Sequence, residues 1–226
     1  NLDYDFADGH GVPLYLYDYG ADIPESEAVD DEYFSDSAFI GNSIMEGFML
    51  YGGIKTADYY AKKSINVVNI STNQVIPSPE GDITIMDALA SKAHSKIFIL
   101  LGINEISFST DRFCECYGSL IADIRELQPE ADIYILSLTP VTRSKSEEGS
   151  KFSKEHILEY NDSLRRLAVK EKVHYVDIYA SMADEEGFLP ENGSFDGIHP
   201  YSQYYRQWAD CLRTHTAVAA DRRHKE

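Results

Sequence analysis

Short apolar runs alternate with amphipathic helical patterns from Ser37 onward, and this alternation limits the fold more than any other feature of the chain. Strands are predicted at Ala38–Ile40, Ile65–Ile70, Lys96–Leu101, Asp132–Leu138 and His174–Tyr179. These runs are almost continuously apolar, which is typical of parallel strands buried on both faces. Strands that alternate with helices form βαβ units with right-handed crossovers. We therefore predict an α/β fold, a three-layer sandwich around a five-stranded parallel sheet.

The covering helices are predicted from apolar residues that recur at three- and four-residue steps. One helix is expected over Phe113–Leu127, before Pro129, and a second over Ile157–Ala168 with Ser153 as its N-cap. A last helix begins at about Ser202. In open parallel sheets the ligand lies beyond the carboxyl ends of the strands, so a functional site is expected in the loops that follow the apolar runs.

The charge balance narrows the class of protein. The 226 residues include 38 Asp and Glu against 20 Lys and Arg, a formal net charge of −18. This excess argues against a nucleic-acid partner and against an anionic membrane surface, because both bind clustered basic residues. No run of about 18 apolar residues occurs, so no membrane span is expected. Hydrophobic residues make up 43% of the chain, enough to build the core of one globular domain.

Composition divides the chain into an acidic, Tyr-rich arm (residues 1–36), the α/β domain (37–216) and a basic tail (217–226). An arm extended along the domain and a partly disordered leader are equally compatible with residues 1–36. The chain begins at Asn1 and not at Met, which suggests a trimmed sequence, so the lack of a signal peptide leaves the compartment open. The acidic arm slightly favours a secreted or cell-surface protein.

The three cysteines are too few and too irregularly spaced for a disulfide framework. Cys114 and Cys116 lie two residues apart on a predicted helix and point to nearly opposite faces, so they are poorly placed to share a metal ion. Isolated thiols are expected.

The loop after the first predicted strand reads Gly41–Asn42–Ser43 and leads into an apolar helical pattern. A serine at the start of a helix lies among unpaired backbone N–H groups and at the positive end of the helix dipole, which favours a developing oxyanion. Gly41 permits the tight backbone path that would expose the hydroxyl. The same position is compatible with a serine that only caps the helix.

Two further loops carry polar residues suited to catalysis. Gly102–Glu105 follows the third predicted strand, and its Asn104 is either an amide donor to the same pocket or a turn residue bonded to its own backbone. Asp196–Pro200 precedes the last helix. Asp196 and His199, three residues apart, can meet through the carboxylate and Nδ1–H, which leaves Nε2 free to accept a proton. A solvated surface histidine is the alternative.

Taken in order, these loops resemble the sequence blocks of the SGNH/GDSL hydrolase family over about residues 33–216. The matching segments are Phe39–Ser43 for the nucleophile block, Leu101–Glu105 for the oxyanion-hole block and Asp196–Pro200 for the acid–base block. The resemblance implies a flavodoxin-like α/β/α fold, with Ser43 as nucleophile, His199 as general base and Asp196 as its orienting acid. It also implies that Asn104 and the backbone N–H of Ser43 donate to the oxyanion.

The chain departs from the family pattern at three places. Asn42 stands where the family usually has Asp, and Glu105 stands where many members have Asp. The family also places a Gly, whose N–H completes the oxyanion hole, near the second strand, yet Lys62–Gln74 contains no Gly. Ser64 or Asn73 is the candidate for that position, because any non-proline residue supplies a backbone N–H.

The expected function is a serine esterase that needs no metal or cofactor and cleaves a small-molecule, carbohydrate or lipid ester through an acyl-enzyme. A short acyl group such as acetyl is favoured if the apolar residues near the three loops surround a shallow pocket, whereas core packing is the other interpretation. These residues are Met45, Phe48, Phe108 and Phe195.

Three alternatives remain open at this stage. The same site could transfer the acyl group to an alcohol, and the departures at Asn42 and near the second strand also fit a binding module without activity. A flavodoxin-like nucleotide binder is weaker, because Glu46 would put an anion where phosphate should bind. The oligomeric state is left open.

Overall fold

The computed structural model describes residues 19, 21–149 and 151–216. The basic tail and most of the predicted arm, residues 1–18 and 20, therefore lie outside the described residues. The division into arm, domain and tail stays a prediction.

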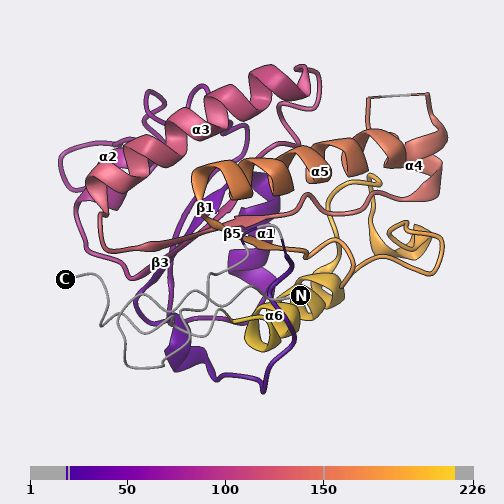
Figure 1. Cartoon of the computed structure of the whole chain (residues 1–226), viewed down its shortest axis with the longest axis horizontal. Helices are drawn as coiled ribbons and strands as arrows, with labels where there is room; N and C mark the ends of the chain where they lie inside the picture. The colour runs from indigo at the N-terminus through magenta and orange to yellow at the C-terminus, as the bar shows by residue number, and fades with distance from the viewer. Residues whose placement is uncertain (1–18, 20, 150, 217–226) are drawn as a thin grey trace, which may run out of the picture.

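Five parallel strands form a single sheet in the order β2-β1-β3-β4-β5. The strands are β1 (Ser37–Gly41), β2 (Asp58–Ala61), β3 (Lys96–Leu100), β4 (Asp132–Leu136) and β5 (His174–Val176). Because every neighbouring pair is parallel and the crossovers contain helices, the predicted flavodoxin-like α/β/α fold is confirmed (Figure 1).

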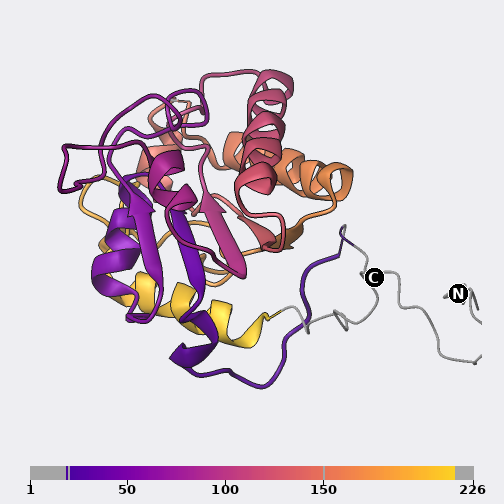
Figure 2. The same cartoon turned by 90° about the vertical axis from the view of Figure 1, so that its left-hand side faces the viewer.

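Helices cover both faces of the sheet, as Figure 2 shows. The longer helices on one face are α3 (Thr110–Leu127) and α5 (Lys154–Glu171), with the short α2 (Ile85–Ala90) beside α3. The opposite face carries α1 (Ser43–Tyr51) and α6 (Ser202–Thr214). Two buried hydrophobic clusters fill the spaces between these layers. The short elements are α4 (Arg143–Glu147) and two 3₁₀ turns, η1 (Asp31–Phe34) and η2 (Glu191–Gly193).

The second strand is the main error of the sequence prediction. Residues 65–70 form no strand, because the chain turns from residue 67 to residue 72, and the true strand at that edge of the sheet is Asp58–Ala61. Asn66 and Asn69 explain the turns, because their side-chain oxygens accept hydrogen bonds from nearby backbone N–H groups. Ile65, Val67 and Ile70 are nevertheless buried, so a loop delivers these apolar side chains to the core.

The described end of the N-terminal arm packs against the end of α6. The backbone N–H of Ser26 donates to the carbonyl of Thr214 at 2.7 Å, and that of Val29 donates to the carbonyl of Arg213 at 3.0 Å. The guanidinium of Arg213 also pairs with Asp31 at 2.8 Å. These contacts join the two ends of the described chain.

Two further expectations can be compared with the described residues. Cys114, Cys116 and Cys211 are all free thiols, as predicted. Within residues 19, 21–149 and 151–216, no helix combines the length and the apolar character that crossing a bilayer requires.

Candidate active site

Ser43 is the first residue of α1 and lies one residue beyond the carboxyl end of the inner strand β1, which ends at Gly41. Asn42, and not Ser43, is the N-cap: its Oδ1 accepts a 3.0 Å hydrogen bond from the backbone N–H of Ile44. The interpretation of Ser43 as only a helix cap is therefore wrong. The hydroxyl of Ser43 is left available, half-buried, at the positive end of the α1 dipole.

The structure brings Ser43, His199 and Asp196 together in one line of hydrogen bonds. Ser43 Oγ lies 2.8 Å from His199 Nε2, although 156 residues separate them in the chain. His199 Nδ1 lies 2.7 Å from Asp196 Oδ2. With Nδ1–H donating to the carboxylate, Nε2 carries the lone pair that faces the serine hydroxyl.

Asp196 is held by several donors at once. Its Oδ1 accepts hydrogen bonds from the backbone N–H groups of His199 at 2.9 Å and Ile198 at 3.0 Å, and from the Ser194 hydroxyl at 3.1 Å. Burial opposes ionisation, but these N–H donors and the imidazole outweigh it and lower the pKa of Asp196 to about 2. Asp196 is therefore a carboxylate at any pH above about 3, and it does not accept the proton that leaves Ser43.

Asn104 lies in the loop after β3, the next strand along the sheet from β1. Its amide Nδ2 donates at 2.7 Å to the backbone carbonyl of Ile65, across the loop after β2. An amide group has two N–H donors, so this bond fixes the side chain and leaves a second N–H. Gly102 precedes it with a φ of +137°, a backbone conformation that favours glycine.

The loop after β2 begins beside the nucleophile strand, because the N–H of Lys62 donates to the carbonyl of Gly41 at 3.2 Å. Of the two candidates for the missing glycine, Asn73 has already used its N–H, which donates to the carbonyl of Asn69 at 2.8 Å. Ser64 has a φ of +68°, a left-handed conformation that glycine adopts most easily. Its N–H has no hydrogen-bond acceptor within the described residues, so Ser64 is the candidate that remains.

Glu105 occupies a fully buried position below these loops. Its Oε1 accepts a 2.6 Å hydrogen bond from the backbone N–H of Val67, whereas Oε2 has no partner within the described residues. Burial raises the pKa of Glu105, although the N–H of Val67 and the backbone groups of its own loop oppose the shift. The longer side chain at this position thus reaches across and anchors the loop after β2.

The apolar residues near the three loops divide between core and surface. Met45 and Phe48 are fully buried, so for them the core-packing interpretation is confirmed. Phe108 packs partly against the core under the Arg112 guanidinium, which lies 4.5 Å from its ring centre. Phe195 is different: 75% of its surface is exposed, and its ring stacks near that of His199 with a centroid separation of 6.3 Å.

The model of the GDSL-like lipase/acylhydrolase family matches residues 39–207. The chain belongs to this family. The predicted resemblance is therefore confirmed, and membership supports an esterase or acylhydrolase activity. Among curated proteins, no relative matches this GDSL-like chain by sequence.

Solved structures share the fold at low sequence identity. A protein of Streptococcus pneumoniae provisionally named a platelet activating factor superimposes with a TM-score of 0.63 at 20% identity, over 78% of this chain and 81% of the other. A GDSL-like lipase from Bacteroides thetaiotaomicron superimposes with a TM-score of 0.56 at 17% identity, over 79% of this chain and 85% of the lipase. An acetyl-xylooligosaccharide esterase from Geobacillus superimposes with a TM-score of 0.54 at 14% identity, over 84% of this chain and 94% of the esterase. These likenesses show the fold of the GDSL-like chain and nothing finer.

Two participants in the site had no distinctive sequence signal. Ser194 contributes its hydroxyl to Asp196, and Val67 contributes a backbone N–H to Glu105. A lone serine two residues before an aspartate is common in turns, and a backbone N–H has no residue type at all. Only the folded arrangement reveals these contacts.

Proposed function

We propose that the protein is a serine esterase that hydrolyses short-chain esters, with acetyl as the favoured acyl group. The observation that carries the proposal is the line of hydrogen bonds from Ser43 through His199 to Asp196, at 2.8 and 2.7 Å. A serine hydroxyl is a weak nucleophile until an adjacent base takes its proton. Here the base is in contact with the hydroxyl and is itself oriented by a carboxylate.

In the first half of the reaction, Ser43 Oγ attacks the ester carbonyl carbon while His199 Nε2 accepts the hydroxyl proton. The carbonyl becomes an oxyanion, and Asp196 stabilises the imidazolium. When the tetrahedral intermediate collapses, the bond to the alcohol oxygen breaks and His199 gives its proton to that oxygen. The alcohol leaves, and the acyl group stays on Ser43.

In the second half, water attacks the acyl-enzyme carbonyl and His199 accepts a proton from the water. Collapse releases the carboxylic acid, and the proton returns to Ser43 Oγ. Ester and water have become acid and alcohol, and the residues are restored.

Three donors are proposed for the oxyanion: the backbone N–H of Ser43, the second amide N–H of Asn104 and the backbone N–H of Ser64. Support comes from the position of Ser43 in the first turn of α1, where its N–H has no helical acceptor, and from the tie between Asn104 and the Ile65 carbonyl. The unused N–H of Ser64 replaces the donor that the family takes from a glycine. Loss of one such donor typically lowers kcat by about 10²- to 10³-fold.

A short acyl group is supported by the burial of the apolar side chains after the nucleophile. Met45 and Phe48 are fixed in the core, so they do not line an open channel for a long chain. Two structures of the same fold are named an acetyl xylan esterase and an acetyl-xylooligosaccharide esterase, at 13% and 14% identity. These names favour acetyl over a fatty acyl group for this chain.

The test compares the wild-type chain with Ser43→Ala on p-nitrophenyl acetate and p-nitrophenyl butyrate, and labels both with a fluorophosphonate. We expect wild-type hydrolysis that is faster on acetate, labelling of the wild type, and neither in the variant. Equal hydrolysis by both chains would show that Ser43 is not the nucleophile. If both chains are inert and the probe fails to label Ser43, the serine is not activated and a binding module becomes the better interpretation. Acyl transfer to added alcohols, measured in the same reactions, would identify a transferase.

A further inference from the structure

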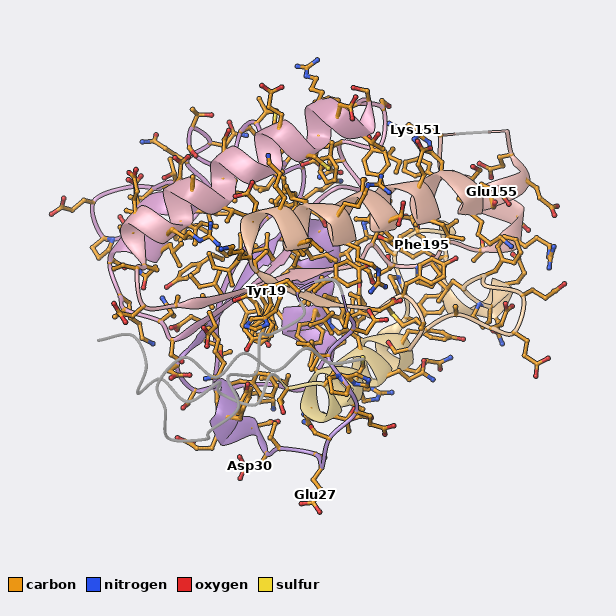
Figure 3. All side chains as sticks on the ribbon, in the orientation of Figure 1. Tyr19, Glu27, Asp30, Lys151, Glu155 and Phe195 are labelled. Carbon is orange, nitrogen blue, oxygen red and sulfur yellow. The ribbon has the colours of Figure 1, made fainter. Side chains whose placement is uncertain are left out.

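A hollow of about 340 Å³ adjoins the triad on the side of Asp196. The side chains that define it here are Thr142, Ser144, Lys145, Glu191, Phe195 and Asp196. Figure 3 shows Phe195 at the end of the molecule where α5 begins, the end at which Glu155 is also labelled. We call this space the Phe195 hollow.

We propose that the Phe195 hollow binds the alcohol portion of the substrate and that this alcohol is a neutral carbohydrate. The inference rests on the proposed esterase function and names its substrate class. Phe195 is then the residue that sets the alcohol specificity.

The chemistry of the reaction places the alcohol next to His199. His199 must give its proton to the leaving alcohol oxygen, so that oxygen lies close to Nε2 when the bond breaks. The rings of Phe195 and His199 are nearly parallel, with an angle of 16° between their planes and 6.3 Å between their centres. An alcohol attached at that oxygen and extending across the His199 ring would reach the face or edge of Phe195.

Phe195 is the most exposed large hydrophobic side chain of the described residues, at 75%, and it belongs to neither buried cluster. Its ring is therefore open to a ligand that stacks on it. The C–H face of a sugar ring is apolar and slightly positive, and it suits the negative face of an aromatic ring. A stacked sugar would cover Phe195 beside the reacting bond.

The remainder of the lining suits hydroxyl groups. Glu191 accepts hydrogen bonds from the N–H and hydroxyl of Ser144 at 2.7 and 2.9 Å, and each carboxylate oxygen keeps a further lone pair. Lys145 pairs with Glu148 at 2.9 Å at the margin of the hollow. Phe195 is the sole large apolar side chain among the described residues that line it, so a fatty alcohol finds little apolar surface.

Charge excludes an acidic alcohol. The lining includes the carboxylates of Glu148, Glu191 and Asp196 against the single ammonium of Lys145. A phosphorylated or uronic acid alcohol would be repelled. A cationic alcohol such as choline would be attracted, but a single aromatic ring with a lysine in the lining is a poor cage for a quaternary ammonium, so we favour a neutral sugar.

The test measures kcat/KM of the full chain by acid release on three acetate esters: an O-acetylated methyl glycoside, ethyl acetate and acetylcholine. The wild type is compared with Phe195→Ala, with Phe195→Tyr, which restores the ring, and with Tyr51→Ala. Tyr51 is a matched control, because it is an exposed aromatic residue (51%) at the far end of α1 from Ser43. Phe195 is so exposed that its replacement leaves the core intact.

We expect the glycoside-to-ethyl-acetate ratio of kcat/KM to fall about tenfold in Phe195→Ala, the size of a lost stacking contact. The ratio should recover in Phe195→Tyr and stay at the wild-type value in Tyr51→Ala. An equal loss on both esters would overturn the inference, because Phe195 would then act through His199 and not on the alcohol. An unchanged ratio, or a loss confined to acetylcholine, would also overturn it.

The results expected if the esterase proposal itself is wrong differ from those expected if only the sugar subsite is wrong. In that case no ester is hydrolysed by any variant and a fluorophosphonate does not label Ser43, which would remove the basis of both proposals. Labelling of Ser43 together with an unchanged substrate ratio leaves the esterase intact and rejects the sugar subsite alone.

Discussion

Glu105 Oε1 accepts a 2.6 Å hydrogen bond from the backbone N–H of Val67, and this contact ties the loop after β3 to the loop after β2. The neighbouring Asn104 makes a second tie between the same loops, to the carbonyl of Ile65 at 2.7 Å. Both loops lie at the carboxyl edge of the sheet, and each carries one of the proposed oxyanion donors, Asn104 and Ser64. A buried carboxyl group therefore holds part of the candidate site in position.

Glu105→Gln should change how stability depends on pH. Burial raises the pKa of Glu105, so its proton stabilises the folded chain below the unfolded pKa of about 4.3, and this contribution is lost as the pH rises through the folded pKa. Gln keeps the acceptor and cannot ionise. Between pH 4.5 and 8.5 the unfolding free energy of the variant should rise relative to that of the wild type, measured by urea denaturation.

The control for this measurement is Glu126→Gln, on the exposed surface of α3. Its unfolding free energy should follow that of the wild type at both pH values. If the unfolding free energies of Glu105→Gln and wild type change with pH in the same way, the prediction is wrong, because Glu105 then has the same pKa in the folded and unfolded chain.

Asn42→Ala should lower the unfolding free energy by about 2 kcal/mol, because it removes the cap of α1 and leaves the buried N–H of Ile44 unpaired. Ser109→Ala is the matched control, since Ser109 caps the more exposed start of α3 and its loss should cost about 1 kcal/mol or less. Fluorophosphonate labelling of Ser43 should slow in Asn42→Ala alone. Equal slowing in both variants would show that the cap has no local effect on the nucleophile.

Ser64→Gly should stabilise the chain. Ser64 has a φ of +68°, where a Cβ atom is strained, so glycine should raise the unfolding free energy by up to about 1 kcal/mol. Lys172→Gly is a positive control, because Lys172 ends α5 with a φ of +51°. Thermal denaturation of both variants measures the effect. A fall in stability for Ser64→Gly would mean that the serine hydroxyl outweighs the backbone strain.

Asp196→Asn should lower kcat by about 10³- to 10⁴-fold with a small change in KM. The amide can donate to Nδ1 of His199, which favours the tautomer with a proton on Nε2 and removes the acceptor for the proton of Ser43. Steady-state kinetics on p-nitrophenyl acetate measure this loss. A loss smaller than tenfold would contradict the proposed role of Asp196.

Asp196 should add no ionisation to the acid side of the pH profile of the wild-type enzyme. General-base catalysis needs the neutral imidazole of His199, so a single protonation should abolish it. Asp196, whose pKa is about 2, stays charged throughout and adds no second step above about pH 3. A slope of two in the plot of log(kcat/KM) against pH would contradict this assignment.

The sequence by itself determined the fold class and four of the five strand positions. The strands β1, β3, β4 and β5 are central or well covered, so their residues form continuous apolar runs that can be recognised locally. The edge strand β2, Asp58–Ala61, has one covered residue in four and shows no such run. The sequence pattern instead predicted a strand at residues 65–70. There, local side-chain hydrogen bonds favour turns over a strand.

The same division applies to the candidate site. Ser43, Asn104, Asp196 and His199 could be named from the sequence, because each stands in a short motif of recognisable type after or before a regular element. Only the tertiary structure decided that Ser43 meets His199, that Asn104 bonds to the Ile65 carbonyl, and that Phe195 stands exposed beside His199. These contacts and this exposure depend on which distant segments the fold brings together, and a local residue pattern cannot predict them.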